Sequence, residues 1–102
     1  MNLQQLLILG RATKDAQVLK SKNGRNYARF SVAVNEYLKS KEEITTYYNA
    51  LIFNKTFENA ELIKKGDLIM LDGKPGVESY LSNEGEAKAS LKIYVNKWKL
   101  IK

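Results

Sequence analysis

Asn-Tyr-Ala-Arg-Phe-Ser-Val-Ala-Val-Asn, residues 26–35, decides the fold because two kinds of side chain alternate along it. The even positions from Ala28 to Val34 are apolar, and the odd positions from Tyr27 to Asn35 are aromatic, basic or small. Successive side chains of a strand point to opposite faces, so this period of two predicts a β-strand with one face in a core. Its aromatic and basic outward face suits a nucleic acid.

A second strand precedes this one and is joined to it by a hairpin. Leu-Leu-Ile-Leu-Gly-Arg at residues 6–11 lies in a strand expected over about 3–14, and residues 15–20 continue or re-enter the sheet. Asn23-Gly24 is a strong turn signal between the two strands.

Three more strands and one short helix are expected downstream. The strands cover residues 46–54, 68–72 and 87–99. Both faces of the first of these carry aromatic residues, so its core side stays open. Thr56 can cap a short helix in which Phe57, Ala60 and Ile63 share a stripe.

The region after residue 72 is expected to interrupt the sheet. Gly73-Lys74-Pro75-Gly76 breaks the ladder, and residues 77–82 form a strand or its extension. A hairpin turn follows at residues 83–86. In the last strand the even residues, from Lys88 through Tyr94 to Trp98, are expected on one face.

Five strands with a single helix between the third and the fourth form the pattern of the all-β OB-fold, a five-stranded Greek-key barrel. An SH3-like barrel and a ubiquitin-like roll share the strand count, but neither has its one helix at this position. The sequence contains no internal repeat and no low-complexity linker, so residues 1–102 are expected to form a single OB-fold domain.

Composition excludes several classes of function. The chain has no cysteine and no histidine, which removes disulfides, thiolate metal sites and the commonest general base. Asp15, Asp67 and Asp72 are expected in turns or caps, because no second carboxylate falls at a spacing that suggests a metal pair. We therefore expect no enzyme, no metal site and no cofactor. No apolar run is long enough to span a membrane, so a soluble, cytoplasmic and nucleoid-associated protein is expected.

The charge of +6 is concentrated in two parts of the chain. Residues 1–41 carry eight Lys or Arg against two acidic residues, and residues 64–102 carry eight against five. Residues 42–63 carry one against four. Basic strands of this kind indicate a polyanionic partner, although a lysine-rich solvated surface would give a similar count.

An ordered set of short motifs resembles the bacterial single-stranded-DNA-binding protein family. The set comprises Leu-Gly-Arg at 9–11, Lys14-Asp15, Asn23-Gly24, residues 28–35, Phe53-Asn54-Lys55, residues 60–68, and Asp72-Gly73 before the strand that contains Tyr80. The resemblance is collinear and covers nearly the whole chain.

The resemblance implies an OB-fold that wraps single strands, with aromatic side chains stacked on bases and Lys or Arg along the phosphates, in a homotetramer or dimer. By position, it implies stacking roles for Tyr47, Phe53 and Tyr80. Together with the outward faces of the strands, it gives these candidate DNA-binding residues: Arg11, Tyr27, Arg29, Tyr37, Lys39, Lys41, Tyr47, Asn49, Phe53, Lys55, Lys74, Tyr80, Lys88 and Lys92.

Some residues depart from the family pattern or have a second interpretation. Leu38 stands where the family often has tryptophan, with Tyr37 beside it as a substitute, and Glu78 lies where the family is usually basic. Phe53 could equally be a core residue. Trp98 is expected to pack against the barrel or in a subunit interface.

The end of the chain is a further difference. Family members generally continue into a flexible linker and an acidic tip that recruits other proteins, whereas this sequence ends Trp-Lys-Leu-Ile-Lys at 98–102. Either the sequence is a piece of a longer chain, or the protein lacks this segment, as a phage, plasmid or other mobile-element protein would.

The expected function is binding of single-stranded DNA without sequence specificity, during DNA replication, recombination or repair. Two alternatives remain open at this stage. The chain could be an adaptor subunit that docks a helicase, primase or polymerase, as in the related primosomal replication protein B. It could also be an RNA-binding OB module.

Overall fold

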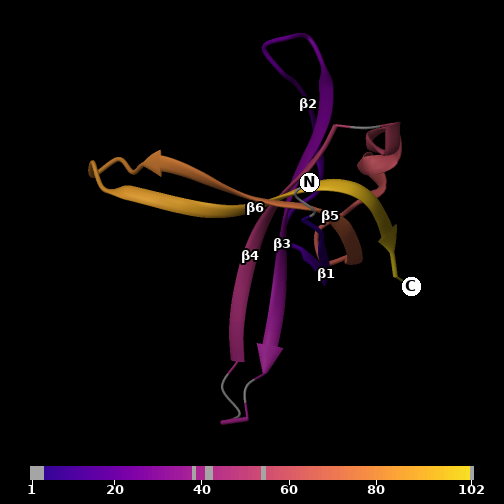
Figure 1. Ribbon diagram of the computed structural model, residues 1–102. Helices are drawn as coiled ribbons and strands as arrows, with labels where there is room; N and C mark the ends of the chain where they lie inside the picture. Colours follow the sequence, from indigo (N-terminus) through magenta and orange to yellow (C-terminus); the bar gives the residue numbers. More distant parts are fainter. Residues whose placement is uncertain (1–3, 38, 41–42, 54, 102) are drawn as a thin grey trace.

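A computed structural model describes residues 4–37, 39–40, 43–53 and 55–101 (Figure 1). Its elements, in chain order, are β1 (Leu6–Ala12), β2 (Gln17–Lys20), β3 (Asn26–Tyr37), β4 (Glu43–Ile52), a 3-10 helix η1 (Lys55–Leu62), β5 (Leu68–Leu81) and β6 (Ala87–Leu100).

Five strands close into a barrel. β5 pairs with β1 on one side and β6 on the other, β6 runs parallel to β4, and β4 is antiparallel to β3. The ring closes where Arg11 and Ala12 of β1 lie opposite Ala33 and Val32 of β3. With η1 between β4 and β5, this is the OB-fold expected from the sequence, and the SH3-like and ubiquitin-like alternatives do not apply.

The hairpin and the alternation that decided the fold are confirmed. Residues 17–20 re-enter the sheet as β2, paired with β3. Gly24 has φ 79°, and its N–H donates to the Ser21 carbonyl at 2.9 Å, so the turn uses glycine's access to positive φ.

The barrel interior contains small and branched apolar side chains contributed by β1, β3, β4, β5, β6 and η1. The buried residues are Ile8, Ala12, Ala28, Phe30, Val32, Ala50, Ile52, Ala60, Ile63, Ile69, Leu71, Ile93 and Val95. The core side of β4 is thus settled as the side of Ala50 and Ile52. Of the stripe expected from Phe57, Ala60 and Ile63, Ala60 on η1 and Ile63 just after it are buried.

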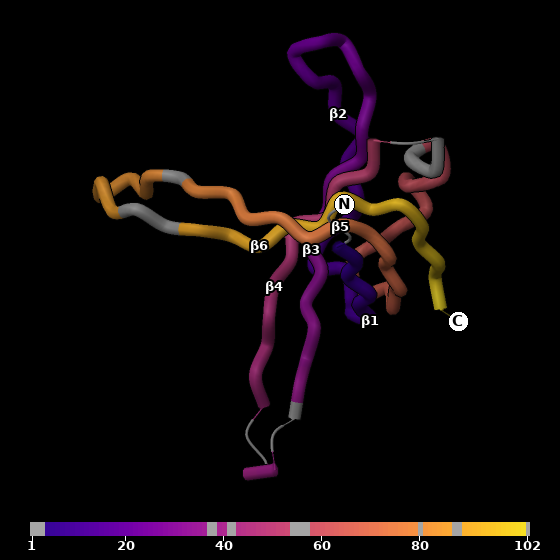
Figure 2. The backbone as a smooth tube through the Cα atoms, in the orientation of Figure 1, coloured from indigo at the N-terminus to yellow at the C-terminus, as the bar shows by residue number. Residues whose placement is uncertain are grey.

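Hairpins extend from the barrel as arms (Figures 1 and 2). The β2–β3, β3–β4 and β5–β6 hairpins leave the centre in different directions, while η1 lies to one side of it. The radius of gyration is 14.6 Å, compared with about 13 Å for a compact domain of this length. The excess reflects these arms.

The expected break at residues 73–76 is wrong, because β5 is continuous from Leu68 to Leu81. Lys74, Pro75 and Gly76 all pair with β6. Pro75 is tolerated because the pairing of β5 with β1 ends at Gly73, so one edge of β5 is open there.

A β-bulge replaces the expected break. Lys97 lies opposite Asp72, whereas the next pair is Val95 with Gly73, so β6 carries one extra residue, Asn96. Bulges of this kind bend a strand and increase its twist. Here the bulge lies between residues 91–94 of β6, which pair with β4 in the barrel, and residues 97–100, which pair with the first part of β5.

The bulge also corrects the expected face of the last strand. Because the side-chain period is two, one extra residue moves everything beyond it to the other face. Trp98 pairs with buried Leu71 and packs against the core with Leu100, so it does not share the outward face of Lys92 and Tyr94.

Two of the three aspartates expected in turns or caps accept hydrogen bonds from backbone N–H groups. Asp15 Oδ1 accepts from Lys65 at 2.8 Å, and Asp67 Oδ2 accepts from Lys64 at 2.9 Å. Asp72 Oδ1 instead accepts from the side chain of Gln5 at 2.9 Å. These roles are structural.

Replacing Gly73 with alanine should destabilise the fold. A Cβ at this position would overlap the carbonyl oxygen of Tyr94 and lie 2.8 Å from its carbon, and backbone at a bulge cannot move aside. We expect Gly73→Ala to lower the free energy of unfolding by about 1–3 kcal/mol, as overpacking commonly does. Urea titration followed by the emission of Trp98 measures it.

Gly76→Ala is the matched control on the same strand. A Cβ at Gly76 would meet only the side chains of Tyr94 and Lys92, at 3.2 and 3.3 Å, and these can shift. Equal losses of stability in the two variants would contradict the role given to the bulge.

Candidate nucleic-acid interface

The outward faces of four strands join into one continuous surface. Arg29 of β3, Leu51 of β4, Tyr94 of β6 and Lys74 of β5 lie in a single row, each opposite the next. Directly opposed residues of paired strands share a face of the sheet, so their side chains lie side by side.

A second row runs parallel to the first. It consists of Ser31 of β3, Asn49 of β4, Lys92 of β6 and Gly76 of β5. The absence of a side chain at Gly76 lets the side chains of Lys92 and Tyr94 lie close over the backbone of β5.

An aromatic cluster lies at one end of this surface. The rings of Tyr27 and Phe53 are stacked, with centroids 4.9 Å apart and planes inclined by 19°. The ring of Tyr94 lies 6.4 Å from that of Phe53, tilted by 34°. Phe53 is therefore a half-buried residue of the outer face and not part of the core.

Two cations lie over the rings of this cluster. The guanidinium of Arg25 is 5.5 Å from the centroid of Phe53, and Nζ of Lys92 is 5.1 Å from that of Tyr94. Such cation–π contacts are attractive and hold the charges beside the rings. Hydrogen bonding with Tyr94 and the charge of Glu78 raise the pKa of Lys92 against the opposing effect of lost hydration, so this lysine is charged at neutral pH.

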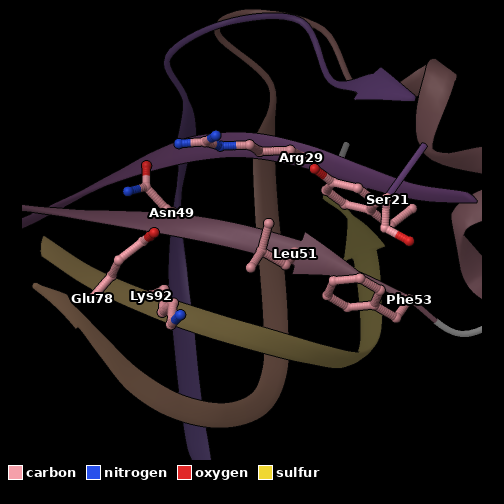
Figure 3. A pocket seen from close by; sticks show the side chains of 8 residues that line it. Ser21, Arg29, Asn49, Leu51, Phe53, Glu78 and Lys92 are labelled. Atoms are coloured by element: carbon pink, nitrogen blue, oxygen red, sulfur yellow. The ribbon is translucent and has the colours of Figure 1, made fainter. Parts of the chain in front are cut away.

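Two adjoining hollows open on the surface, and Figure 3 shows the first of them. The aromatic hollow, of about 220 Å³, is lined by Ser21, Tyr27, Arg29, Asn49, Leu51, Phe53, Glu78 and Lys92. The polar hollow, of about 330 Å³, is lined by Arg29, Asn49, Glu78 and Ser90. Open stacking surfaces beside fixed positive charges are what proteins use to hold unpaired bases and their phosphates.

Five of the candidate residues come together here. Tyr27, Arg29, Asn49, Phe53 and Lys92 all line the aromatic hollow. They come from β3, from β4 and the residue that follows it, and from β6.

Four other candidates lie outside the hollows. Lys74 is exposed on β5, opposite Tyr94 of β6. Arg11 is exposed on β1, and its Nη1 donates to the carbonyl of Gly66 at 3.0 Å. Tyr47 is 63% exposed and lies opposite Ala33 on the β3–β4 arm. Lys39 is exposed beyond the end of β3.

Several sequence predictions concern residues outside the described part of the chain. Lys41 and Leu38 lie there entirely, and so do the side chains of Thr56, expected as a helix cap, and Phe57. The side chains of four further candidates also lie outside it, although their backbones belong to described elements: Tyr37, Lys55, Tyr80 and Lys88.

Sequence reasoning left three contributors out of the candidate set: Arg25, Leu51 and Tyr94. The period of two in the last strand was a sufficient signal for Tyr94. Leu51 shares a strand face with Asn49 and Phe53, but an aliphatic residue there also fits a core. The contact of Arg25 with Phe53 depends on how the β2–β3 turn folds back, for which no local pattern exists.

Within the described residues, no three acidic side chains gather in a way that could hold a metal ion. Nor does any helix of that part have the length and apolar character needed to cross a membrane.

Comparison with known proteins agrees with this geometry. The barrel and its open outer face define an OB-fold, and two solved structures share this fold. A small single-stranded DNA-binding protein from Streptomyces coelicolor has a TM-score of 0.83 at 18% identity, covering 99% of this chain and 96% of that one. A Plasmodium falciparum SSB in complex with ssDNA has a TM-score of 0.78 at 19% identity, covering 99% and 95%.

Sequence comparison gives the family. The model of the single-strand binding protein family matches residues 3–101, so the chain belongs to that family. A single-stranded DNA-binding protein from Halalkalibacterium halodurans is 34% identical over 86 residues, or 81% of this chain. The match covers 51% of that protein, so the chain spans about half the length of this curated relative.

Proposed function

We propose that this protein binds single-stranded DNA, chiefly through base stacking and phosphate contacts common to all sequences, during DNA replication, recombination or repair. The observation that carries the proposal is the cluster of Tyr27, Phe53 and Tyr94 with Arg25 and Lys92 over its rings. Every base has a π-face, so stacking on such a cluster is worth about 1–3 kcal/mol per base with little regard to sequence.

The geometry supports single strands over duplex. The rings lie on a sheet surface between arms, where a flexible strand can turn its bases inward. In a duplex the base faces are covered by their neighbours, so only phosphates would reach the cluster. The Plasmodium falciparum SSB that shares this fold was solved in complex with ssDNA.

The remaining candidates fit a path for the strand beyond the cluster. We assign phosphate contacts to Arg11, Arg29, Lys39, Lys41, Lys55, Lys74, Lys88 and Lys92, further base contacts to Tyr37, Tyr47 and Tyr80, and a polar contact to Asn49. Exposed Tyr47 would extend the stacking surface along the β3–β4 arm.

The competing roles have less support. The family match favours DNA binding over an adaptor function or an RNA-binding module. We propose a binding protein and not an enzyme.

We also treat residues 1–102 as one domain, because β1 and β5, from opposite halves of the sequence, pair along β1. Because the DNA that the protein would bind lies in the cytoplasm, we expect the protein there.

A homo-oligomer is the expected working form. Leu7 and Leu9 are 64% and 53% exposed on the outward face of β1, with Met70 beside them on β5. Among the described residues, β1 pairs with β3 only at Arg11 and Ala12, so the rest of that edge is open. An open edge with apolar side chains is a template for pairing, and we propose that a second copy covers it.

Titration with oligothymidine tests the proposed function. We expect binding at low salt, with log affinity falling against log salt by about 0.7 per phosphate neutralised. Fluorescence anisotropy of a labelled 12-mer at several salt concentrations measures the slope. No binding at low salt, or equal affinity for duplex, would refute the proposal.

Alanine variants test the aromatic surface. Phe53→Ala and Tyr47→Ala should each weaken oligothymidine binding by about 1–3 kcal/mol, because each removes a stacking ring. Val77→Ala is the control, since Val77 is exposed on the other face of β5. Trp98 packs against the core and reports folding. A folded Phe53→Ala variant with unchanged affinity would contradict the site.

Light scattering tests the oligomer. The protein should scatter as a dimer or tetramer, and Leu7→Glu with Leu9→Glu should reduce its mass towards that of one chain, because charges there oppose burial. Val18→Glu on β2 is an equally exposed control. A single-chain mass for the unaltered protein would overturn this expectation.

A further inference from the structure

We propose that Glu78 gives this surface a base preference, and that the polar hollow accepts guanine in preference to thymine. The inference rests on the proposed function and deepens it. Its starting observation is a carboxylate within a face whose other charged groups, Arg29 and Lys92, are cationic.

Glu78 is positioned to meet a ligand. It lies opposite Ser90 in the β5–β6 pair and lines both the aromatic and the polar hollow. It is exposed, and its charge acts on Lys92 at longer range. Among the described residues it makes no hydrogen bond or ion pair of its own, so both carboxylate oxygens are available to a bound group.

The groups facing Glu78 are donors. The Ser31 hydroxyl lies 3.1 Å from Oδ1 of Asn49 and donates to it, which leaves the Asn49 amino group directed to other partners. Arg29 is donor-only, and it lines both hollows. Figure 3 shows the polar ends of Arg29, Asn49 and Glu78 gathered away from the Phe53 ring. The hollow therefore offers one double acceptor beside two donors.

Guanine has the complementary edge. Its N1–H and N2 amino group are adjacent donors that match the two oxygens of a carboxylate, and its neighbouring O6 is an acceptor for Asn49 or Arg29. Thymine has one donor, N3–H, between two carbonyl oxygens. A carboxylate at that edge is repelled by both, so Glu78 favours guanine and opposes thymine.

Phosphate contact is a poor alternative role for this end of the hollow. A carboxylate repels phosphate, so Glu78 weakens the backbone binding that Lys92 and Arg29 provide. A base edge that presents hydrogen-bond donors is instead attracted to the carboxylate, so Glu78 strengthens the binding of such a base. Because the two hollows share Arg29, Asn49 and Glu78, a strand stacked on Tyr27 and Phe53 carries a neighbouring base over the carboxylate.

Competition between oligonucleotides tests the inference. Alternating d(TG)6 and dT12 compete against one labelled strand at fixed salt, for the unaltered protein and for Glu78→Gln. We expect d(TG)6 to bind about fivefold or more tightly than dT12, the lower end for one bidentate base contact. In Glu78→Gln the ratio should fall to within about twofold, mainly because dT12 binds better.

Glu84→Gln is the matched control, because it removes the same charge from the exposed tip of the same hairpin. It should leave the ratio unchanged. A ratio near one in the unaltered protein, a ratio retained in Glu78→Gln, or a ratio lost in Glu84→Gln would each overturn the inference alone. Failure of both oligonucleotides to bind would overturn the proposed function as well.

Discussion

The bulge of β6 opposite Gly73 is the constraint on which the rest of the structure depends. Before it along the chain, Ile93 and Val95 fill the core while Lys92 and Tyr94 face outward. Beyond it, Trp98 and Leu100 pack against the core beside β5. One extra residue thus lets a single strand complete the core at both ends and still contribute to an open face.

The open outer face exists because the core uses only every second side chain of each strand. Small residues such as Ala28 and Ala50 leave the interior narrow, so five strands are enough to enclose it. The outward positions are then free of packing demands. One row on this face is formed by four neighbouring strands, each of which supplies one residue: Arg29, Leu51, Tyr94 and Lys74.

The sequence predicted the features that depend on a repeating pattern of side chains, and it missed those that depend on a single residue. Alternation over residues 26–35, the Asn23-Gly24 turn and the helix stripe of Ala60 and Ile63 were enough for the barrel. The bulge was missed because no local pattern distinguishes an added residue from ordinary alternation, and Pro75 suggested a break. For the site, alternation placed Tyr27, Arg29 and Lys92 outward, but the contact of Arg25 with Phe53 requires the folded turn.

The charge of the protein and the acid in its site serve different ends. Lys and Arg bind phosphate by counterion release, which is strong and indifferent to sequence. Arg25 and Lys92 are also held over aromatic rings, so their charges stay beside the proposed stacking surface. An acid in that setting can only reduce affinity for the backbone. That loss of affinity is offset where a base edge supplies hydrogen-bond donors. By our proposal, Glu78 therefore lowers the general affinity of the face and makes the face discriminate between bases.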